Sequence, residues 1–239
     1  MTDIDLRGDL WIGATPLIRD LALRLPGGGW SVLLGPSGVG KSTLGRLIAG
    51  LPGVYRLEGA FAPPPGGVAM MAQDGQLLPW ADLVHNVTIG ARLRGARPDT
   101  ARARTLLAEV GLAGLERRRP DALSGGQRQR VALARVLMED CAVVVLDEPF
   151  SALDSATRLA MQDLAARLLR GRCVVLITHD PLEAIRLADR AWLLSAGGAE
   201  ALALPDAPTP RDYRAPRTLE AQARLLGRLH AMEPAACAG

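Results

Sequence analysis

Short apolar runs alternate with longer segments of helical periodicity along this chain. Residues 30–34 form one short apolar run. The runs at 142–146 and 173–178 are continuous and rich in β-branched residues, as expected for strands that are buried on both faces of a sheet. Between the last two, residues 155–170 repeat apolar positions at helical spacing, and most of 80–140 does the same with arginine on its polar faces. Strands that alternate with helices in this way predict an α/β fold with a largely parallel sheet.

The remaining segments predict smaller elements. Residues 52–67 are rich in Pro and Gly and predict turns and short strands, whereas "GVAMMAQ" predicts a strand that ends at Gln73. The Pro-rich stretch 203–216 predicts extended chain, and the periodic stretch 218–232 predicts a closing helix. These elements suit one main domain followed by a short extension.

Composition and charge narrow the class of protein. The 239 residues are 49% hydrophobic, which is enough for a substantial core, and the net charge of +3 is too small to indicate nucleic-acid binding. No segment reaches the roughly 18 apolar residues of a membrane-spanning helix, and the acidic N-terminus lacks the apolar core of a signal peptide. We therefore expect a cytoplasmic protein that reaches the membrane only through a partner.

Lys41 is the one lysine among the 28 lysine and arginine residues, and it lies in "GPSGVGKST". This stretch matches the phosphate-binding pattern Gly-x-x-x-x-Gly-Lys-Ser, and it stands between an apolar run and a helical pattern as that motif requires. In such a loop the backbone N–H groups surround the phosphates, the lysine reaches the β- and γ-phosphates, and Ser42 offers its hydroxyl to Mg²⁺. A fortuitous glycine-rich turn is the alternative, but it does not explain the order of strand, loop and helix. The expected nucleotide contacts in the loop are Gly35, Pro36, Ser37, Gly38, Val39, Gly40, Lys41, Ser42 and Thr43.

A pair of carboxylates, Asp147 and Glu148, ends the apolar run "AVVVL". Asp147 is placed to hold Mg²⁺ or its water, and Glu148 is the candidate base that polarises the attacking water. A solvated pair that starts a loop is the alternative, and a buried strand downstream of a phosphate loop makes it the weaker interpretation.

Between these motifs lies "ALSGGQRQRVALARVL", residues 122–137, whose Leu-Ser-Gly-Gly-Gln is the signature of the ABC-type ATPases. The chain resembles the ATP-binding subunit of an ABC transporter over residues 4–195. The resemblance implies a P-loop NTPase fold, with a RecA-like parallel core sheet and flanking helices, a small N-terminal antiparallel β part and an inserted helical subdomain. It places the ATP-binding domain at 1–200, the helical subdomain at about 78–138 and a short C-terminal extension at 201–239.

The resemblance also implies site residues and partners. Gln73 would sense Mg²⁺ and water, and His179 in "THD" would be the catalytic switch histidine beside Glu148 and Lys41. In the family, the phosphate loop of one subunit and the signature of the other enclose each ATP, so a second copy of the chain is the expected partner. Metal contacts are then expected from Ser42, Gln73 and Asp147, and further nucleotide contacts from Ser124, Gly125, Gly126, Gln127 and Asp154.

Two features depart from the family pattern. An aromatic residue that stacks on adenine is expected upstream of the phosphate loop, where simple register places Ile12. Trp11 is adjacent, and we predict that Trp11 makes this contact. In addition, no large regulatory domain is expected after residue 200.

The segment after Gln73 indicates which transporter group is closest. Its "LLPW" followed by a short helix is similar to importer ATPases of the nitrate, sulfonate and taurine group, and other segments, such as "THDPLEAIRLADR", resemble a related branch linked to pyrimidine precursors of thiamine. We therefore expect a pyrimidine precursor of thiamine as the leading substrate, ahead of nitrate, sulfonates and taurine. We expect Leu77, Leu78, Pro79 and Trp80 to form an apolar surface for a helix of an integral-membrane permease, which a secreted substrate-binding protein would serve. The alternative is that Trp80 is ordinary core.

Other nucleotide-binding classes fit less well. A soluble ABC-type ATPase of DNA repair or translation is the principal alternative, but such proteins usually carry a long coiled-coil insertion or two ATPase halves. Guanine selection by Asn-Lys-x-Asp needs a lysine, and the one lysine is already in the phosphate loop. A small kinase would leave the signature unexplained.

Overall fold

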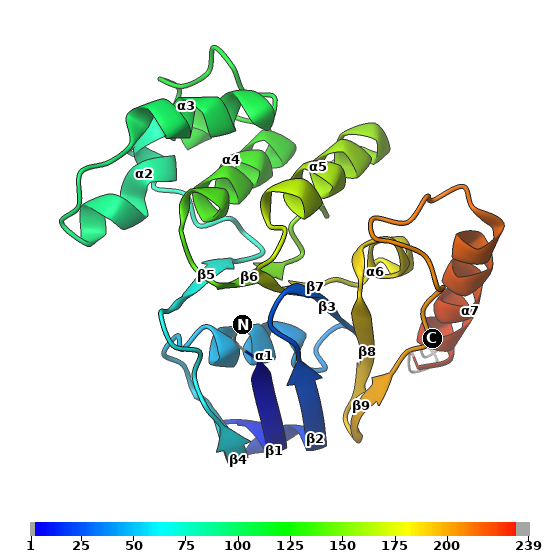
Figure 1. Cartoon of the computed structure of the whole chain (residues 1–239). Helices are drawn as coiled ribbons and strands as arrows, with labels where there is room; N and C mark the ends of the chain where they lie inside the picture. The colour runs from blue at the N-terminus through cyan, green and yellow to red at the C-terminus, as the bar shows by residue number, and fades with distance from the viewer. Residues whose placement is uncertain (1–2, 233–239) are drawn as a thin grey trace, which may run out of the picture.

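The computed structural model describes residues 3–232, and a six-stranded sheet lies at its centre (Figure 1). The first five strands of the sheet are parallel, and the last pairs antiparallel at the edge. This arrangement confirms the predicted α/β fold with a mostly parallel core. The strand order is β5 (Val68–Met71), β6 (Val143–Asp147), β7 (Cys173–Ile177), β3 (Gly29–Leu34), β8 (Arg190–Ser195) and β9 (Gly198–Ala201).

A second, antiparallel sheet lies beside the first, with the helix α1 (Lys41–Ile48) between them (Figure 1). The stretch expected to form turns and short strands contributes one strand to its edge. Alternating residues of the long strands enter a shared apolar core with α1 and one face of the central sheet, so only that half of each strand is buried. The strand order is β2 (Thr15–Leu25), β1 (Ile4–Ile12) and β4 (Tyr55–Phe61).

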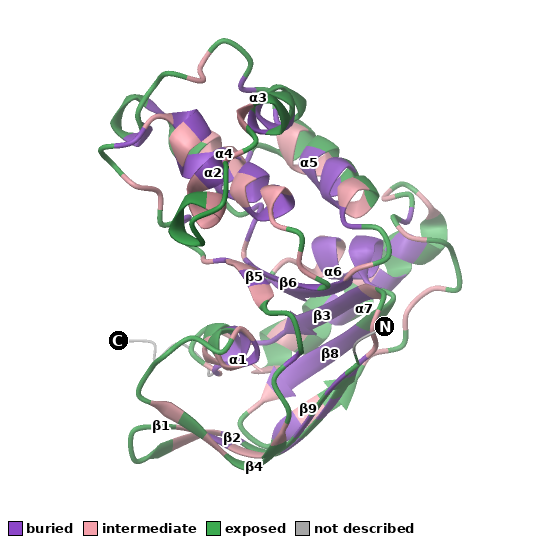
Figure 2. Cartoon of the chain, turned by 60° about the vertical axis from the view of Figure 1, so that its left-hand side comes forward, coloured by how far each residue is buried: buried purple, intermediate pink, exposed green. Residues whose placement is uncertain are grey.

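Helices lie on the side of the opposite face of the central sheet, and their buried residues, purple in Figure 2, form one apolar core with that face. In β6, Val144 and Leu146 belong to this core, whereas Val143 and Val145 belong to the core around α1. The strand is therefore apolar on both faces, as its unbroken run of aliphatic residues predicted. The helices on this side are α2 (Leu83–Leu93), α3 (Thr100–Glu109), the 3₁₀ turn η1 (Pro120–Ala122), α4 (Gly125–Met138), α5 (Ser155–Leu168) and α6 (Pro181–Leu187).

The helices α2 to α4 are inserted between β5 and β6, within the segment expected to form the helical subdomain. After β9 the chain runs without helix or strand to α7 (Pro216–Met232), which packs against α6. Arg211 anchors this run, because its buried guanidinium donates to the carbonyl oxygens of Ile185 and Ala188. Within residues 3–232, no helix has both the length and the apolar character that crossing a membrane requires.

Candidate nucleotide site

The candidate site forms where four neighbouring strands end. The strands β5, β6, β7 and β3 lie side by side and parallel, so the loops that follow them leave the same edge of the sheet. Gln73 follows β5, Glu148 follows β6, His179 follows β7 and the phosphate loop follows β3. The carboxyl edge of a parallel sheet is where α/β proteins bind ligands. Segments far apart in the sequence thus supply one site.

The phosphate loop has the backbone that the motif requires. Gly35 has φ 153° and Gly40 has φ 109°, conformations that strain residues with a side chain. A Cβ on Gly35 would lie 2.6 Å from the carbonyl oxygen of Leu194, so substitution there would also clash with β8. Gly40 caps α1, and the helix N-terminus with its free N–H groups therefore opens directly onto the loop.

Lys41 and the carboxylates form the charged floor of the site. Lys41 is only 7% exposed, and its ammonium donates to the carbonyl oxygens of Gly35 at 2.7 Å and Pro36 at 2.8 Å. Burial lowers the pKa of Lys41, and the negative charges of Glu148 and Asp147 act in the opposite direction. The loop therefore holds one cation facing two carboxylates, with Ser37 and Gly38 exposed above it.

Asp147 and Ser42 suit a divalent cation. Asp147 is 3% exposed, and its Oδ1 is buried without a hydrogen-bond partner among the described residues. Burial raises the pKa of Asp147, while a hydrogen bond from Ser42 lowers it. An orphaned carboxylate oxygen beside a hydroxyl fits Mg²⁺, which takes few protein ligands and completes its shell with water and phosphate oxygens.

The Glu148 carboxylate lies within hydrogen-bond distance of both Gln73 and His179, the two residues expected to assist it in hydrolysis. It accepts from the Gln73 side chain at 3.1 Å and lies 3.1 Å from Nδ1 of His179. The side chain of Glu148 is 17% exposed, whereas that of His179 is 60% exposed. The carboxylate is thus held at the edge of the site, with the histidine open to solvent.

Two adjoining depressions of about 390 and 480 Å³ lie over these residues, and both are lined by Ser42, Thr43 and Gln73. The first also contains Lys41 and Glu148, and the second contains Asp147. No signature residue lines either depression.

The signature forms a separate surface. Ser124 caps α4, its hydroxyl accepting from the Gln127 N–H at 3.2 Å while the Gln127 side chain accepts from the Ser124 N–H at 2.9 Å. Ser124 and Gly125 are exposed, and Gly126 faces the loop after β6, since a Cβ on it would lie 3.0 Å from the Ala152 carbonyl oxygen. One chain therefore presents an exposed helix N-terminus that its own phosphate loop does not use.

Asp154 acts locally as the N-cap of α5, because its carboxylate accepts from the Thr157 N–H at 3.0 Å. This bond lowers the pKa of Asp154. The residue is exposed and does not line the depressions over the phosphate loop, so its expected nucleotide contact would have to be with a second copy.

The structure does not support Trp11 as the adenine contact. The Trp11 ring lies between the guanidinium groups of Arg19, at 5.4 Å, and Arg56, at 4.8 Å from its centroid. Ile12 and Leu17 line the depression over the phosphate loop instead. Neighbouring residues of a strand face opposite sides, so Ile12 and Trp11 cannot both turn toward the nucleotide. Ile12 is the better candidate.

Gln129 was not anticipated from the sequence. It is 6% exposed, and its side chain donates to the Glu148 carbonyl oxygen at 2.9 Å and accepts from the Ala152 N–H at 3.0 Å. A glutamine on the otherwise apolar stripe of a helix is the only signal in the sequence. That signal does not say which loop the side chain meets.

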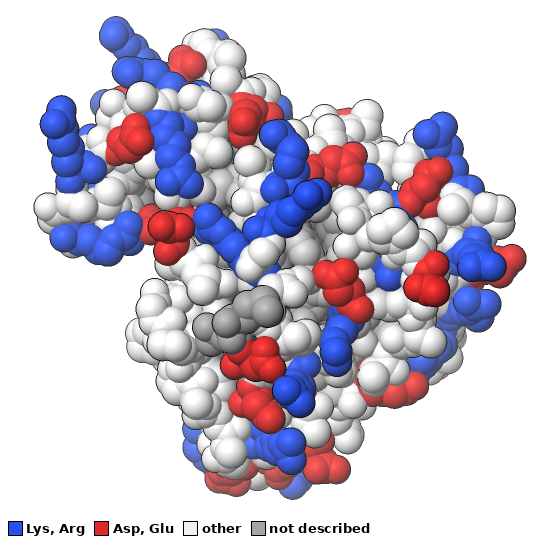
Figure 3. Space-filling model, in the orientation of Figure 1, with Lys and Arg blue, Asp and Glu red and all other residues white. Residues whose placement is uncertain are grey.

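The segment after Gln73 forms an exposed surface on the helical subdomain. Trp80 is 69% exposed, which excludes the alternative that it is core, while Leu77 and Leu78, close to it in the sequence, are half-buried. Asn86 holds the segment, since its amide bonds both the N–H and the carbonyl oxygen of Leu78. Several arginine side chains lie on the face of the subdomain that Figure 3 shows.

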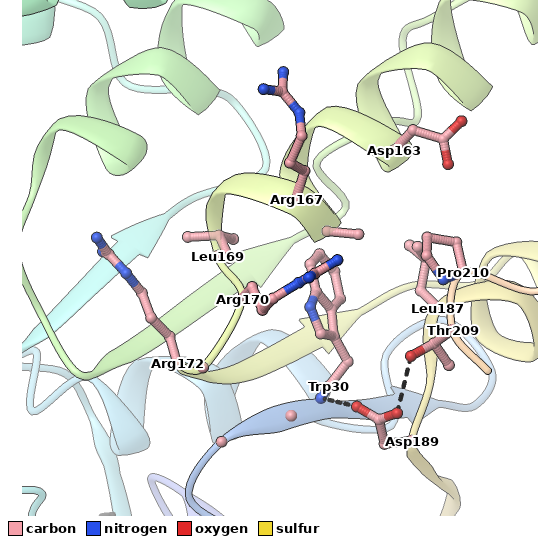
Figure 4. Close-up of a pocket in the computed structure, with 14 residues that line it drawn as sticks. Trp30, Asp163, Arg167, Leu169, Arg170, Arg172, Leu187, Asp189, Thr209 and Pro210 are labelled. Carbon is pink, nitrogen blue, oxygen red and sulfur yellow. Dashed lines mark hydrogen bonds between the residues drawn. The ribbon is translucent and has the colours of Figure 1, made fainter.

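A further cavity of about 410 Å³ lies at the opposite end of the central strands, beside Trp30 (Figure 4). Asp189 in its floor is already bonded to the Trp30 N–H and the Thr209 hydroxyl. The side chains of Arg167 and Arg172 point away from the cavity centre, so they do not converge on a ligand.

Comparison with known proteins identifies the family. Residues 18–151 match the family model described as "ABC transporter". The chain belongs to this family, whose ATP-binding domains hydrolyse ATP for transport. The expected ABC ATPase fold and the ATPase activity are thereby confirmed.

Named relatives refine the comparison. The chain is 46% identical to the aliphatic sulfonates import ATP-binding protein SsuB 2 of Rhizobium johnstonii over 220 residues, covering 90% of this chain and 86% of the relative. It is 41% identical to an uncharacterized ABC transporter ATP-binding protein of Haemophilus influenzae, covering 89% of this chain and 92% of that protein. A solved structure described as a dimeric post-hydrolysis state of the ATP-binding cassette MJ0796, bound to ADP and Pi, is similar with TM-score 0.70 and 26% identity, covering 89% of this chain and all of that one.

Proposed function

We propose that this chain is the ATP-hydrolysing subunit of an ABC importer, and that two copies enclose two ATP molecules and drive a membrane permease. The observation that carries the proposal is the division of the site. The phosphate loop and Glu148 share one depression, whereas the signature of the same chain is exposed elsewhere. A second copy placed head to tail would complete both sites.

Within each site the residues have separate tasks. The N–H groups of the phosphate loop and the ammonium of Lys41 bind the β- and γ-phosphates. Glu148 takes the proton of the attacking water, because its carboxylate lies beside the site and is held by Gln73 and His179. His179 contacts the γ-phosphate side through its exposed ring.

Ser42, Gln73 and Asp147 would hold Mg²⁺, which neutralises charge on the transferring phosphoryl group. The Oδ1 of Asp147, which has no hydrogen-bond partner within residues 3–232, supports this assignment. The adenine would pack on Ile12, and Ser124 to Gln127 of the second copy would contact the γ-phosphate of the bound ATP.

The partner in the membrane would be a permease that seats a cytoplasmic helix on the surface of Leu77, Leu78, Pro79 and Trp80. An exposed tryptophan near two half-buried leucines in one short segment is the type of surface that binds an amphipathic helix. The protein would thus act at the inner face of the cell membrane without entering it, and a substrate-binding protein outside would deliver the cargo.

For the cargo, the relatives named for aliphatic sulfonate import favour an organosulfonate over a pyrimidine precursor of thiamine. This inference is by relatedness alone, because no residue of an ATP-binding subunit touches the transported molecule. Binding of candidate sulfonates and pyrimidines to the secreted partner protein would decide between them.

Purified protein tests the enzymatic part of the proposal. ATP hydrolysis should be slow, should require Mg²⁺ and should fall to background in Glu148→Gln, which should instead accumulate an ATP-bound dimer. A monomer that ignores ATP and binds nucleic acid tightly would contradict the proposal.

A further inference from the structure

Gln129 connects the helix of the signature to the segment that carries the candidate base. It lies one turn into α4, and its amide nitrogen donates to the Glu148 carbonyl oxygen at 2.9 Å and to the Ser151 hydroxyl at 3.1 Å. Its amide oxygen accepts from the Ala152 N–H at 3.0 Å. All three bonds of this buried side chain therefore go to residues 148–152.

Glu148 has a backbone conformation that needs such support. Its φ is +48°, in the left-handed region that residues with a side chain adopt only when their surroundings impose it. Its N–H donates to the Ile177 carbonyl oxygen at 2.9 Å, and its carbonyl oxygen accepts from Gln129. The peptide group before the residue is thus held by β7. The one after it is held by α4 through Gln129 and within the loop by the Ser151 hydroxyl, which donates to the same carbonyl oxygen at 3.1 Å.

The direction of the Glu148 side chain follows from this backbone. The carboxylate reaches Gln73 and His179 from a Cα whose orientation depends on the two peptide groups around it. Gly126 packs within one turn of Gln129 and touches the same loop, since a Cβ on it would lie 3.0 Å from the Ala152 carbonyl oxygen. A displacement of α4 therefore moves a hydrogen-bond donor of Glu148.

We propose that Gln129 is a positioning residue for ATP hydrolysis, which holds the backbone of Glu148 in its left-handed conformation and couples the orientation of the signature helix to the catalytic carboxylate. The inference rests on the proposed role of Glu148 and adds a residue outside the phosphate loop, the signature and the switch histidine. It predicts that Gln129 affects turnover and leaves ATP binding by the separate subunit intact.

Two variants test it. Gln129→Met keeps the length of the side chain and removes every hydrogen bond, while Gln129→Glu keeps the acceptor for Ala152 and loses the amide donors. Both should lower kcat by about 10- to 100-fold, the range for residues that orient a catalytic group. The Kd of each variant for ATP, measured on the subunit alone, should stay within roughly twofold of wild type.

The control is Gln162→Met. Gln162 is a buried glutamine of α5, 1% exposed, whose amide oxygen accepts from Arg186 at 2.9 Å. Its substitution should lower Tm to a similar extent and leave kcat near the wild-type value.

Wild type and Glu148→Gln are measured in the same assay, so that a failure of the inference about Gln129 can be distinguished from a failure of the proposed role of Glu148. Gln129 variants that hydrolyse at the wild-type rate, beside an inactive Glu148→Gln, would overturn the inference alone. An equal loss of kcat in Gln162→Met would show that kcat merely follows Tm, and it would overturn the inference as well. Normal hydrolysis by Glu148→Gln would overturn the role of Glu148 and, with it, the inference.

Discussion

Lys41 lies between two carbonyl oxygens of its own loop, where a slender ammonium fits and a planar guanidinium does not. The side chain is almost fully buried, and both of its bonds are to backbone oxygens less than 3 Å away. An ammonium on a flexible stem can turn from these oxygens to two phosphates, whereas arginine presents a wide fork with a fixed geometry. This explains why a chain that otherwise uses arginine keeps one lysine.

Lys41→Arg should therefore reduce ATP hydrolysis by about 100-fold or more, although the charge is retained. Steady-state phosphate release with saturating ATP and Mg²⁺ measures the effect. Near-normal turnover would show that charge alone suffices at this position. Arg7→Lys, an exposed exchange on β1 away from both depressions, is the control.

Ile12 and Trp11 give a second test at this scale. Ile12→Ala should weaken ATP binding by about 1 kcal/mol, roughly fivefold in Kd, because it removes apolar contact from the depression. Trp11→Ala should change Kd by less than roughly twofold, since its ring lies between Arg19 and Arg56 outside the site. Titration of a fluorescent ATP analogue measures both, and the reverse order of effects would restore Trp11 as the adenine contact.

The sequence predicts those site residues whose role depends on local order. The phosphate loop is a strand, a glycine turn and a helix in succession, so its geometry is implied by neighbouring residues. Trp11 was preferred to Ile12 for its aromatic ring, although simple register pointed to Ile12. The structure favours Ile12, because the Trp11 ring contacts Arg19 and Arg56, which the neighbouring strands β2 and β4 bring to it. Gln129 was missed because its partners lie on a loop that only the packed fold brings to it.

Among the elements, the short helix α6 holds the loop around His179, which follows β7. Glu183, 3% exposed on its first turn, accepts from the Thr178 hydroxyl at 2.6 Å, and this hydroxyl accepts from the Asp180 N–H at 3.0 Å. Asp180 also pairs with Arg158 of α5 at 3.2 Å. The residues on both sides of His179 are therefore fixed to neighbouring helices.

This element should give the protein a pH-dependent stability. Burial raises the pKa of Glu183 to about 7, Asp180 acts in the same direction, and Thr178, Arg158 and His179 oppose it. The folded state keeps the proton that the unfolded chain releases near its ordinary value of 4.5, so the contribution of Glu183 to stability falls as pH rises through this window.

Glu183→Gln should consequently raise the free energy of unfolding relative to wild type at about pH 8, by an amount on the order of 3 kcal/mol, and the gain should fade toward about pH 5. Urea unfolding of both proteins at several pH values measures the difference. A gain that does not depend on pH would show that the charge of Glu183 is not its cause.

The segment from Leu77 to Trp80 is the second element with a distinct prediction. Trp80→Ala should weaken binding to permease-containing membranes by about 2 kcal/mol, roughly 30-fold in Kd, as expected for an aromatic anchor. Leu93, 81% exposed at the end of α2, provides the control, and Leu93→Ala should bind nearly as wild type. Equal losses of binding affinity in both variants would argue against a specific permease-binding site at Trp80.

At the scale of the whole molecule, the order of elements was readable because the buried strands and helical stripes are strongly periodic. The parallel sheet then brings the ends of β5, β6, β7 and β3 together, and the site follows from that order. The residues alone could not show that the signature of one chain lies outside the depressions over its own phosphate loop. This separation depends on how α4 packs over the sheet, and it is the basis for a site shared between two copies.

Mixing two inactive variants tests this central claim most directly. Lys41→Ala disables a phosphate loop, and Ser124→Arg blocks a signature, so each variant alone should lack ATP hydrolysis. In a head-to-tail heterodimer, the intact loop of one copy meets the intact signature of the other, and an equal mixture should regain up to about a quarter of wild-type hydrolysis. A mixture no more active than the separate variants, beside an active wild type, would contradict the shared site.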